Sequence, residues 1–207
     1  MGKKVFFSFH YKDVEDFRAN VVRNHWVVKE KQEGAGYFDS SIWEEAQKTS
    51  SVALKRLINS ELIGTSVTSV LIGTHTYQRP WVKYEIFRSI YKGNNLLGVH
   101  INSIKGKDSK TKTLGLNPFN YTGIYFNKDG SKYAFITRES VNDQWKYWEE
   151  IESTRFHEND YFKKQYAKEN SEKCIPLAKF FSIYDWVADD GYKSLLKSKQ
   201  VFITKTS

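Results

Sequence analysis

A tryptophan and a glutamate four residues apart, Trp81 and Glu85, are the residues whose types and spacing are best suited to chemistry. Residues at this spacing lie on one face of a helix, so the indole and the carboxylate would be neighbours. A carboxylate placed there could stabilise positive charge on a bound ligand. In an alternative, structural interpretation, Trp81 packs in the core and Glu85 pairs with Arg88 or a surface lysine. The motif alone does not choose between the two.

Signatures of other catalytic and binding sites are missing from the sequence. It has no G-x-G-x-x-G after the first predicted strand, no Walker phosphate loop, no H-E-x-x-H and no G-x-S-x-G turn. Cys174 is the only cysteine, which excludes an intrachain disulfide and a zinc finger and is typical of a reducing compartment. We therefore expect no metal and no bound cofactor.

The composition predicts a folded protein with a substantial apolar core. Of the 207 residues, 40% are hydrophobic and 16% aromatic, and the net charge is +8. The basic residues are spread along the chain, and their densest cluster, residues 105–112, is predicted to be a solvated loop, so nucleic-acid binding is not favoured. No apolar run approaches the roughly 20 residues that span a bilayer, and the N-terminus does not have the form of a signal peptide. A cytoplasmic location without membrane contact is expected.

The elements that must position Trp81 and Glu85 alternate between strands and helices. Three apolar runs, at 5–9, 67–73 and 96–101, are typical of strands that are covered on both faces. Helices are predicted at 14–28 with Asp13 as N-cap, from a capping box at Ser41 to Ile58, and from Pro80 to Gly93, with a short strand at 36–39. This alternation predicts an α/β fold with a central parallel sheet and helices on both faces.

The alternation stops after residue 105. Residues 121–126 and 132–137 predict a β-hairpin, residues 144–151 a helix, and the aromatic segment 180–187 a stretch that packs back on the core. We expect one domain over residues 1–207, with a core at about 3–105 and an aromatic-rich extension at about 106–207. Ligands of such sheets bind beyond the carboxyl ends of the strands, which directs attention to residues 8–10, 39–41 and 73–75.

The whole arrangement resembles TIR domains, which have a flavodoxin-like fold, and more narrowly the TIR-like proteins of bacterial Thoeris antiphage defence systems. Besides W-x-x-x-E, the resemblance is carried by F-F-S-F-H-Y at 6–11, V-R-N-H-W at 22–26, A-L-K-R-L-I at 53–58 and Y-D-W-V-A-D-D-G-Y at 184–192. It covers residues 3 to about 105, and the last of these segments extends it nearly to the C-terminus.

The resemblance implies an enzyme that breaks the nicotinamide–ribose bond of NAD⁺ and releases a cyclic ADP-ribose isomer. This messenger would activate a separate effector protein, and NAD⁺ would be substrate rather than cofactor. Glu85 corresponds to the family's essential carboxylate. The residues that line the substrate pocket in the family correspond here to Phe9, His10, Asp39 and Trp43.

From the residues themselves, Trp81, Tyr84 and Trp43 offer flat surfaces to nicotinamide or adenine, and each is also explained by core packing. Enzymatic relatives outside defence often have basic residues after the serine–aromatic pair of strand one. This chain has His10 and Tyr11 there, which leaves open how the phosphates are held.

Two other functions remain open from the sequence. Many TIR domains are adaptors that act only through TIR–TIR contacts, and Trp81 and Glu85 would then be structural. The second alternative is a flavodoxin-like domain that binds a nucleotide without converting it. Even for the enzyme, the resemblance implies self-association through TIR–TIR contacts, since a neighbouring subunit often completes the site in this family.

Overall fold

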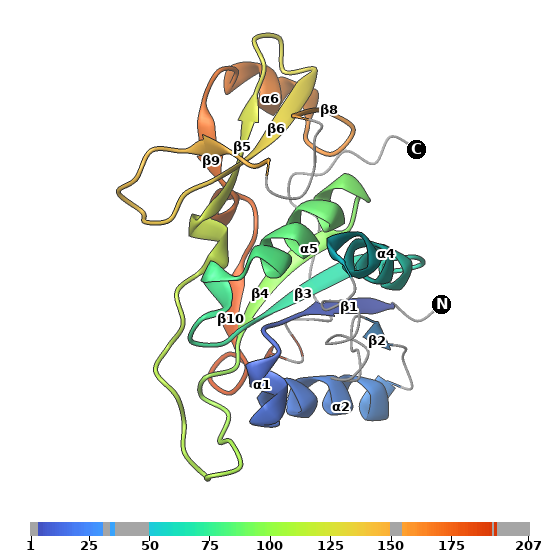
Figure 1. Ribbon diagram of the computed structural model, residues 1–207, viewed down its shortest axis with the longest axis vertical. Coiled ribbons are helices and arrows are strands. Elements are labelled where there is room, and N and C mark those ends of the chain that lie inside the picture. Colours follow the sequence, from blue (N-terminus) through green and yellow to red (C-terminus); the bar gives the residue numbers. More distant parts are fainter. Residues whose placement is uncertain (1–3, 31–33, 36–49, 150–154, 192, 194–207) are drawn as a thin grey trace. The chain divides into compact units, whose positions relative to one another are not determined.

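The computed structural model describes residues 4–30, 34–35, 50–149, 155–191 and 193 (Figure 1). The chain divides into two compact units, residues 1–116 with 183–198 and residues 117–182 with 199–207. The single domain expected over residues 1–207 stays a prediction. Within the described ranges, no helix has both the length and the apolar character that crossing a membrane requires.

The first unit is built on a parallel sheet, as the alternation predicts. The strand order is β10-β4-β3-β1-β2, and every neighbouring pair is parallel. Read from β2, the first four strands have the flavodoxin-like order 2-1-3-4. The bounds are Val5–Ser8 (β1), Gly34–Ala35 (β2), Val67–Ile72 (β3), Asn95–His100 (β4) and Ile183–Asp185 (β10).

Helices cover both faces of this sheet, which explains why its strands are apolar on nearly every position (Figure 1). Val5 and Phe7 of β1 share a buried cluster with Trp26 of α2 (Arg18–Glu30). The alternate residues face α5 (Pro80–Tyr91), where the Thr68 and Ser89 hydroxyls lie 2.7 Å apart. Helix α4 (Ser51–Glu61) packs beside α5 and is joined to it by the Asn59 side chain.

The first predicted helix, 14–28, is interrupted. A short α1 (Lys12–Glu15) ends before Phe17, whose φ of 64° is left-handed, and α2 begins at Arg18. A residue in the left-handed conformation interrupts the helical hydrogen bonds, so the helix ends there. The apolar spacing in the sequence nevertheless continues across the break, which is why the sequence predicts one helix. Asp13 is therefore no N-cap. It lies inside α1 and is buried.

The second predicted helix is shorter than expected. Helix α4 begins at Ser51, and the extended Ser50 caps it by accepting a hydrogen bond from the Ala53 amide at 3.1 Å. The expected start at Ser41 and the strand expected at 36–39 lie outside the described residues. The third helix is confirmed: Pro80 occupies its first turn, and Gly93 follows its end with φ of 80°.

The fifth strand of the sheet comes from the far end of the chain. Strand β10 pairs with β4, and Tyr184 and Trp186 pack against the cluster on the α2 face. Asp185 fixes the following turn, because its Oδ1 accepts from the Ser103 hydroxyl at 2.7 Å and from two backbone amides at 2.9 Å. Tyr184 and Trp186 of the predicted aromatic segment therefore pack back on the core, whereas Phe180 and Phe181 belong to the second unit.

Trp186→Ala is expected to destabilise the first unit by about 2 kcal/mol, because it removes a half-buried indole from the core cluster. The measurement is the free energy of unfolding in urea. Val187→Ala is the matched control, because Val187 is 62% exposed and its truncation should cost less than about 0.5 kcal/mol. Equal effects of the two variants would contradict the packing of β10.

The second unit contains the predicted hairpin. Strands β5 (Thr122–Phe126) and β6 (Lys132–Thr137) are antiparallel and belong to a sheet of order β7-β6-β5-β9, with β8 also on β6. It carries an aromatic core in which the Phe162 ring contacts the rings of Phe126, Tyr133 and Phe180. The other strands and the helix of this unit are Lys146–Tyr147 (β7), Phe156–Glu158 (β8), Lys164–Glu169 (α6) and Cys174–Pro176 (β9). Its 3₁₀ turns are Pro118–Asn120 (η2) and Leu177–Lys179 (η3), and the 3₁₀ turn Thr76–Gln78 (η1) belongs to the first unit.

The helix predicted at 144–151 is wrong over the residues described there. Lys146 and Tyr147 instead form β7, which pairs with β6. Trp145 and Trp148 are three apart, a spacing that suggested a helical face. In the structure the Trp145 ring lies 4.3 Å from the Arg138 guanidinium carbon, while Trp148 is buried after β7. The aromatic spacing reflects two separate contacts.

Candidate active site

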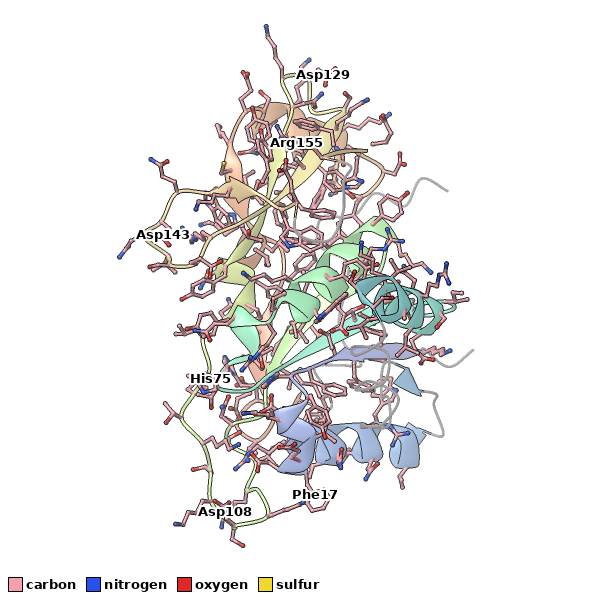
Figure 2. The ribbon with its side chains drawn as sticks, in the orientation of Figure 1. Phe17, His75, Asp108, Asp129, Asp143 and Arg155 are labelled. Atoms are coloured by element: carbon pink, nitrogen blue, oxygen red, sulfur yellow. The ribbon has the colours of Figure 1, made fainter. Side chains whose placement is uncertain are left out.

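The carboxyl ends of β1 and β3 form the edge at which this fold binds ligands. The two strands are neighbours, but the chain leaves β1 toward β2 on one side and reaches β3 on the other. Connections that diverge in this way open a crevice beyond the strand ends. His10 follows β1, and His75 follows β3, where Figure 2 labels it.

Glu85 lies on the face of α5 that meets the sheet and is only 4% exposed. The Ser8 hydroxyl, at the last position of β1, donates a hydrogen bond of 2.5 Å to Glu85 Oε2. Ser8 is itself fully buried. The structure thus joins the end of the first strand to the candidate carboxylate, across 77 residues of sequence.

Burial controls the protonation of this carboxyl group. Desolvation raises the pKa of Glu85 to about 8, and the hydrogen bond from Ser8 opposes that rise by favouring the charged form. A carboxyl group that titrates near neutral pH inside an α/β edge is a feature of functional sites. Its charge is therefore sensitive to anything cationic that binds beside it.

Trp81 and Tyr84 are brought together, but their environments differ. Their ring centroids are 5.7 Å apart in an edge-to-face arrangement. Tyr84 is 1% exposed, and its hydroxyl accepts a hydrogen bond of 3.1 Å from Asn59 of α4. Trp81 is half-buried at the start of α5, one turn before Glu85. The position of Tyr84 suits packing between helices, whereas Trp81 keeps part of its surface open to a ligand.

Phe9 and His10 follow β1 directly and are both half-buried. Phe9 packs against the core cluster on the α2 face. Burial is the main cause that lowers the pKa of His10 to about 4, and Arg79 and Lys12 lower it further. The His10 imidazole is thus neutral at physiological pH and can donate one hydrogen bond. Asp39 and Trp43, the other expected pocket residues, lie outside the described residues.

Comparison with known proteins agrees with this geometry. Residues 6–105 match the family described as Thoeris protein ThsB, TIR-like domain. The chain is also 49% identical over 193 residues to a protein of Bacillus cereus (strain MSX-D12) named "Putative cyclic ADP-D-ribose synthase ThsB1". That alignment covers 93% of this chain and 96% of the relative. The chain belongs to the Thoeris ThsB TIR-like family. The membership confirms the resemblance and the flavodoxin-like TIR fold.

Sequence reasoning missed Asp13 as a residue of this ThsB-type edge. Its carboxylate is 5% exposed and lies against Gly73, where a Cβ atom would stand 2.3 Å from either oxygen. Burial raises the pKa of Asp13 to about 6, against the opposing effect of Lys112 and Arg18. No periodic pattern marks such a residue, because its position depends on the break at Phe17.

The loop after β4 is confirmed as a solvated loop, since residues 107–114 are all exposed, but side chains of the first unit also fix it to the edge of the TIR-like sheet. Arg18 is 1% exposed and donates hydrogen bonds to the carbonyls of Ile104 and Lys110 at 2.9 and 2.7 Å. Asn102 donates to the Thr113 carbonyl at 2.7 Å. At the outer end of the loop, the Lys107 Nζ atom lies 4.3 Å from the Phe17 ring centroid.

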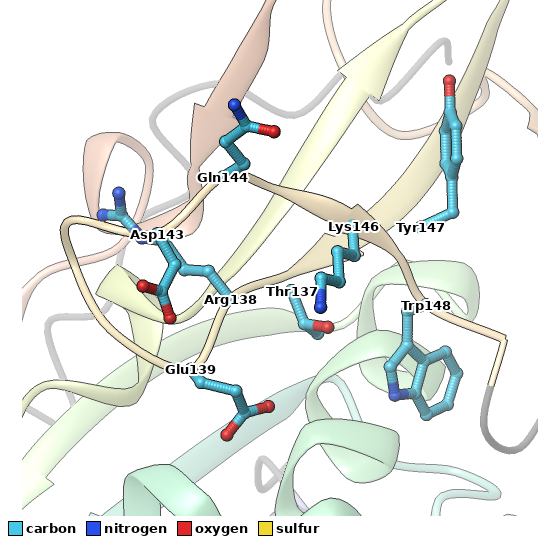
Figure 3. Close-up of a pocket in the computed structure, with 8 residues that line it drawn as sticks. All are labelled: Thr137, Arg138, Glu139, Asp143, Gln144, Lys146, Tyr147 and Trp148. Carbon is cyan, nitrogen blue, oxygen red and sulfur yellow. The ribbon is translucent and has the colours of Figure 1, made fainter.

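The second unit has a polar hollow of about 540 Å³ that is separate from these residues (Figure 3). Arg138, Glu139, Asp143 and Lys146 give it mixed charge, and Tyr147 and Trp148 add aromatic walls. The Arg138 side chain is already bound to the Asn120 and Val141 carbonyls. None of the predicted site residues that the structure describes lines it.

Proposed function

We propose that this protein cleaves the nicotinamide–ribose bond of NAD⁺ and releases a cyclic ADP-ribose isomer. The observation that carries the proposal is the buried carboxyl group of Glu85, hydrogen-bonded to Ser8 at the ligand-binding edge of the sheet. The name of the Bacillus cereus relative, which refers to cyclic ADP-D-ribose synthesis, points to the same chemistry.

The residues present suit this reaction. The nicotinamide of NAD⁺ is already cationic, so it leaves as a neutral base without a proton from the protein. Its departure develops oxocarbenium character on the ribose, as in glycoside hydrolysis. Ionised Glu85, facing that sugar in a water-poor site, stabilises the positive charge more strongly than it would in water. One carboxylate is enough for this step.

Cyclisation requires that a nucleophile within the same molecule reaches the cation before water does. Trp81 beside Glu85 provides an apolar surface that helps to exclude water. The adenosine half of the molecule would fold back over this surface to supply the attacking atom. The product then has the same atoms as NAD⁺ less nicotinamide, with no water added.

The wider setting follows the family. The proposed enzyme works in the cytoplasm, uses NAD⁺ as substrate without a further cofactor, and self-associates through TIR–TIR contacts that regulate its turnover. The cyclic product diffuses to a separate effector protein. If Glu85 is instead purely structural, the chain is an adaptor, and this alternative predicts no consumption of NAD⁺ in any assembled state.

The deciding experiment is incubation of the purified chain, and of lysate from phage-infected cells that express it, with NAD⁺. Mass spectrometry is expected to show free nicotinamide and a cyclic ADP-ribose isomer. Linear ADP-ribose alone would contradict cyclisation, and unchanged NAD⁺ in both preparations would favour the adaptor.

Ser8→Ala is expected to lower NAD⁺ consumption about tenfold at pH 7, because it removes the hydrogen bond that orients Glu85 and favours its charged form. Ser69→Ala is a matched control. Ser69 is equally buried on the neighbouring strand, and its hydroxyl has no hydrogen-bond partner among the described residues. Initial rates of the two variants should differ by that factor, and equal rates would remove Ser8 from the mechanism.

A further inference from the structure

Three segments of the first unit converge beyond the ends of β1 and β3. The turn after β1 leads into α1, the turn after β3 leads through η1 into α5, and the loop 102–116 folds across both. The contacts are close: a Cβ atom on Gly115 would stand 1.9 Å from the Gly73 carbonyl oxygen, and the Thr74 hydroxyl donates to the Thr113 carbonyl at 3.0 Å. This packing fixes where the loop places its lysines.

Cationic side chains from all three segments gather at this point. Arg79, Lys12, His75 and Lys112 each act on the imidazole of His10. Arg79 and Lys112 act on the carboxylate of Asp13 as well, and that carboxylate lies against Gly73 at the end of β3. Asp16, the other carboxylate placed there, is bound by both Arg18 and Lys112. The positive charge of Arg79 has no such counterpart among the ion pairs of the described residues.

The start of α5 adds to the attraction for an anion. Arg79 is its N-cap residue and makes no side-chain cap, Pro80 follows, and the first turn has no acidic residue. The first amides of a helix have no partner within the helix and carry partial positive charge. The Arg79 Nε atom is buried and has no hydrogen-bond partner in the part of the chain that the structure describes. A buried donor and an uncapped helix start thus meet at one place.

The spacing along α5 relates this place to Glu85. Arg79 precedes Glu85 by six residues, which is about 9 Å along a helix axis. Six residues also rotate the helix by about 600°, so Arg79 and Glu85 lie on different sides of it, with Glu85 toward the sheet and Arg79 at the amino end. The two residues would therefore meet different parts of one ligand, the carboxylate its ribose and the amino end its phosphates.

We propose that Arg79 and Lys112, with the amino end of α5, bind the pyrophosphate of NAD⁺. This assignment rests on the proposed function. Neutral His10, on whose imidazole both cations act, donates a hydrogen bond without adding charge. The assignment answers what the sequence left open, because the cations absent after the first strand are supplied by the α5 N-cap and by the loop after β4. Lys112 keeps its contact with Asp16, which holds its ammonium group at the site.

The test measures binding of ADP-ribose to the purified full-length chain by isothermal titration calorimetry, since this probe has the pyrophosphate but no bond to break. Arg79→Gln and Lys112→Gln are each expected to weaken binding about tenfold. Lys112→Arg should retain the affinity, because it keeps both the charge and the Asp16 contact. Lys105→Gln removes the same charge from an exposed position of the same loop and should bind like the wild type.

Added salt should weaken binding by the wild type more than by Arg79→Gln. Equal ADP-ribose affinities for Arg79→Gln, Lys112→Gln and Lys105→Gln would overturn the assignment, as would a wild-type chain that does not bind ADP-ribose at low salt. Melting curves identify any variant that is unfolded. A wild type that binds ADP-ribose through these residues but leaves NAD⁺ intact would refute the proposed reaction and support the binding site, so the two failures are distinguishable.

Discussion

Glu85→Gln is expected to lower NAD⁺ consumption by at least about 10³-fold and to abolish formation of the cyclic product. The amide fits the same space but cannot carry the negative charge that opposes the developing oxocarbenium ion. The Ser8 hydroxyl can still donate to the amide oxygen, so the local geometry should be kept. Nicotinamide release measured under identical conditions for both proteins gives the ratio. Glu15→Gln, an exposed change in α1, is the control and should retain full activity.

The stability of the same variant shows whether the loss is chemical or structural. The pKa of Glu85 is about 8 in the folded chain and about 4.5 when exposed. Between these values the unfolded chain releases the proton and the folded chain keeps it. The free energy of unfolding of the wild type therefore falls as pH rises, by up to about 1.4 kcal/mol per pH unit from this group.

The glutamine of Glu85→Gln has no titratable proton, so the free energy of unfolding of this variant should not show the fall with rising pH that Glu85 causes in the wild type. In urea denaturation, the variant should match the wild type near pH 4.5 and exceed it at pH 8. A variant that is less stable than the wild type at both pH values would show that Glu85 stabilises the fold, and its inactivity would then say nothing about catalysis.

The sheet and α5 could be predicted because each depends on a repeating local signal. Strands β1 and β3 are mostly apolar and buried at every position, since helices cover both faces, and α5 is bounded by Pro80 and Gly93. The pairing of Trp81 with Glu85 needs only helical geometry. The place of Glu85 on α5, at the edge of the sheet, could therefore be predicted from the sequence, whereas its catalytic role is implied by the family resemblance and stays a prediction.

The partners of Glu85 and the cations around the site could not be predicted in the same way. The hydrogen bond from Ser8 depends on the side of β1 on which α5 lies, which no short segment determines. Lys112 lies in a sequence that is typical of a solvated loop, and side chains from other segments, among them Thr74 and the buried Arg18, hold that loop in place. Strand β10 likewise pairs with a strand more than eighty residues earlier in the chain.

The rate of NAD⁺ cleavage by the wild type is expected to rise about tenfold between pH 6 and pH 7 and to level off above about pH 8 to 9. Below a pKa of about 8, the ionised fraction of Glu85 increases tenfold per pH unit, and only the ionised form stabilises the ribosyl cation. His10, with a pKa of about 4, is already neutral across this range. Asp13, with a pKa of about 6, completes its ionisation near pH 7 and cannot cause a rise above it.

The two kinetic parameters should differ in a definite direction. The profile of kcat/KM reports the free enzyme, whereas that of kcat reports the complex with substrate. Bound NAD⁺ places a cationic nicotinamide beside Glu85, which lowers the pKa of the carboxyl group, so the kcat profile should rise at lower pH than the kcat/KM profile. Ser8→Ala should shift both profiles to higher pH, because it removes the hydrogen bond that favours the charged form. A rate independent of pH from 6 to 9 would mean that the charge of Glu85 does not take part in the reaction.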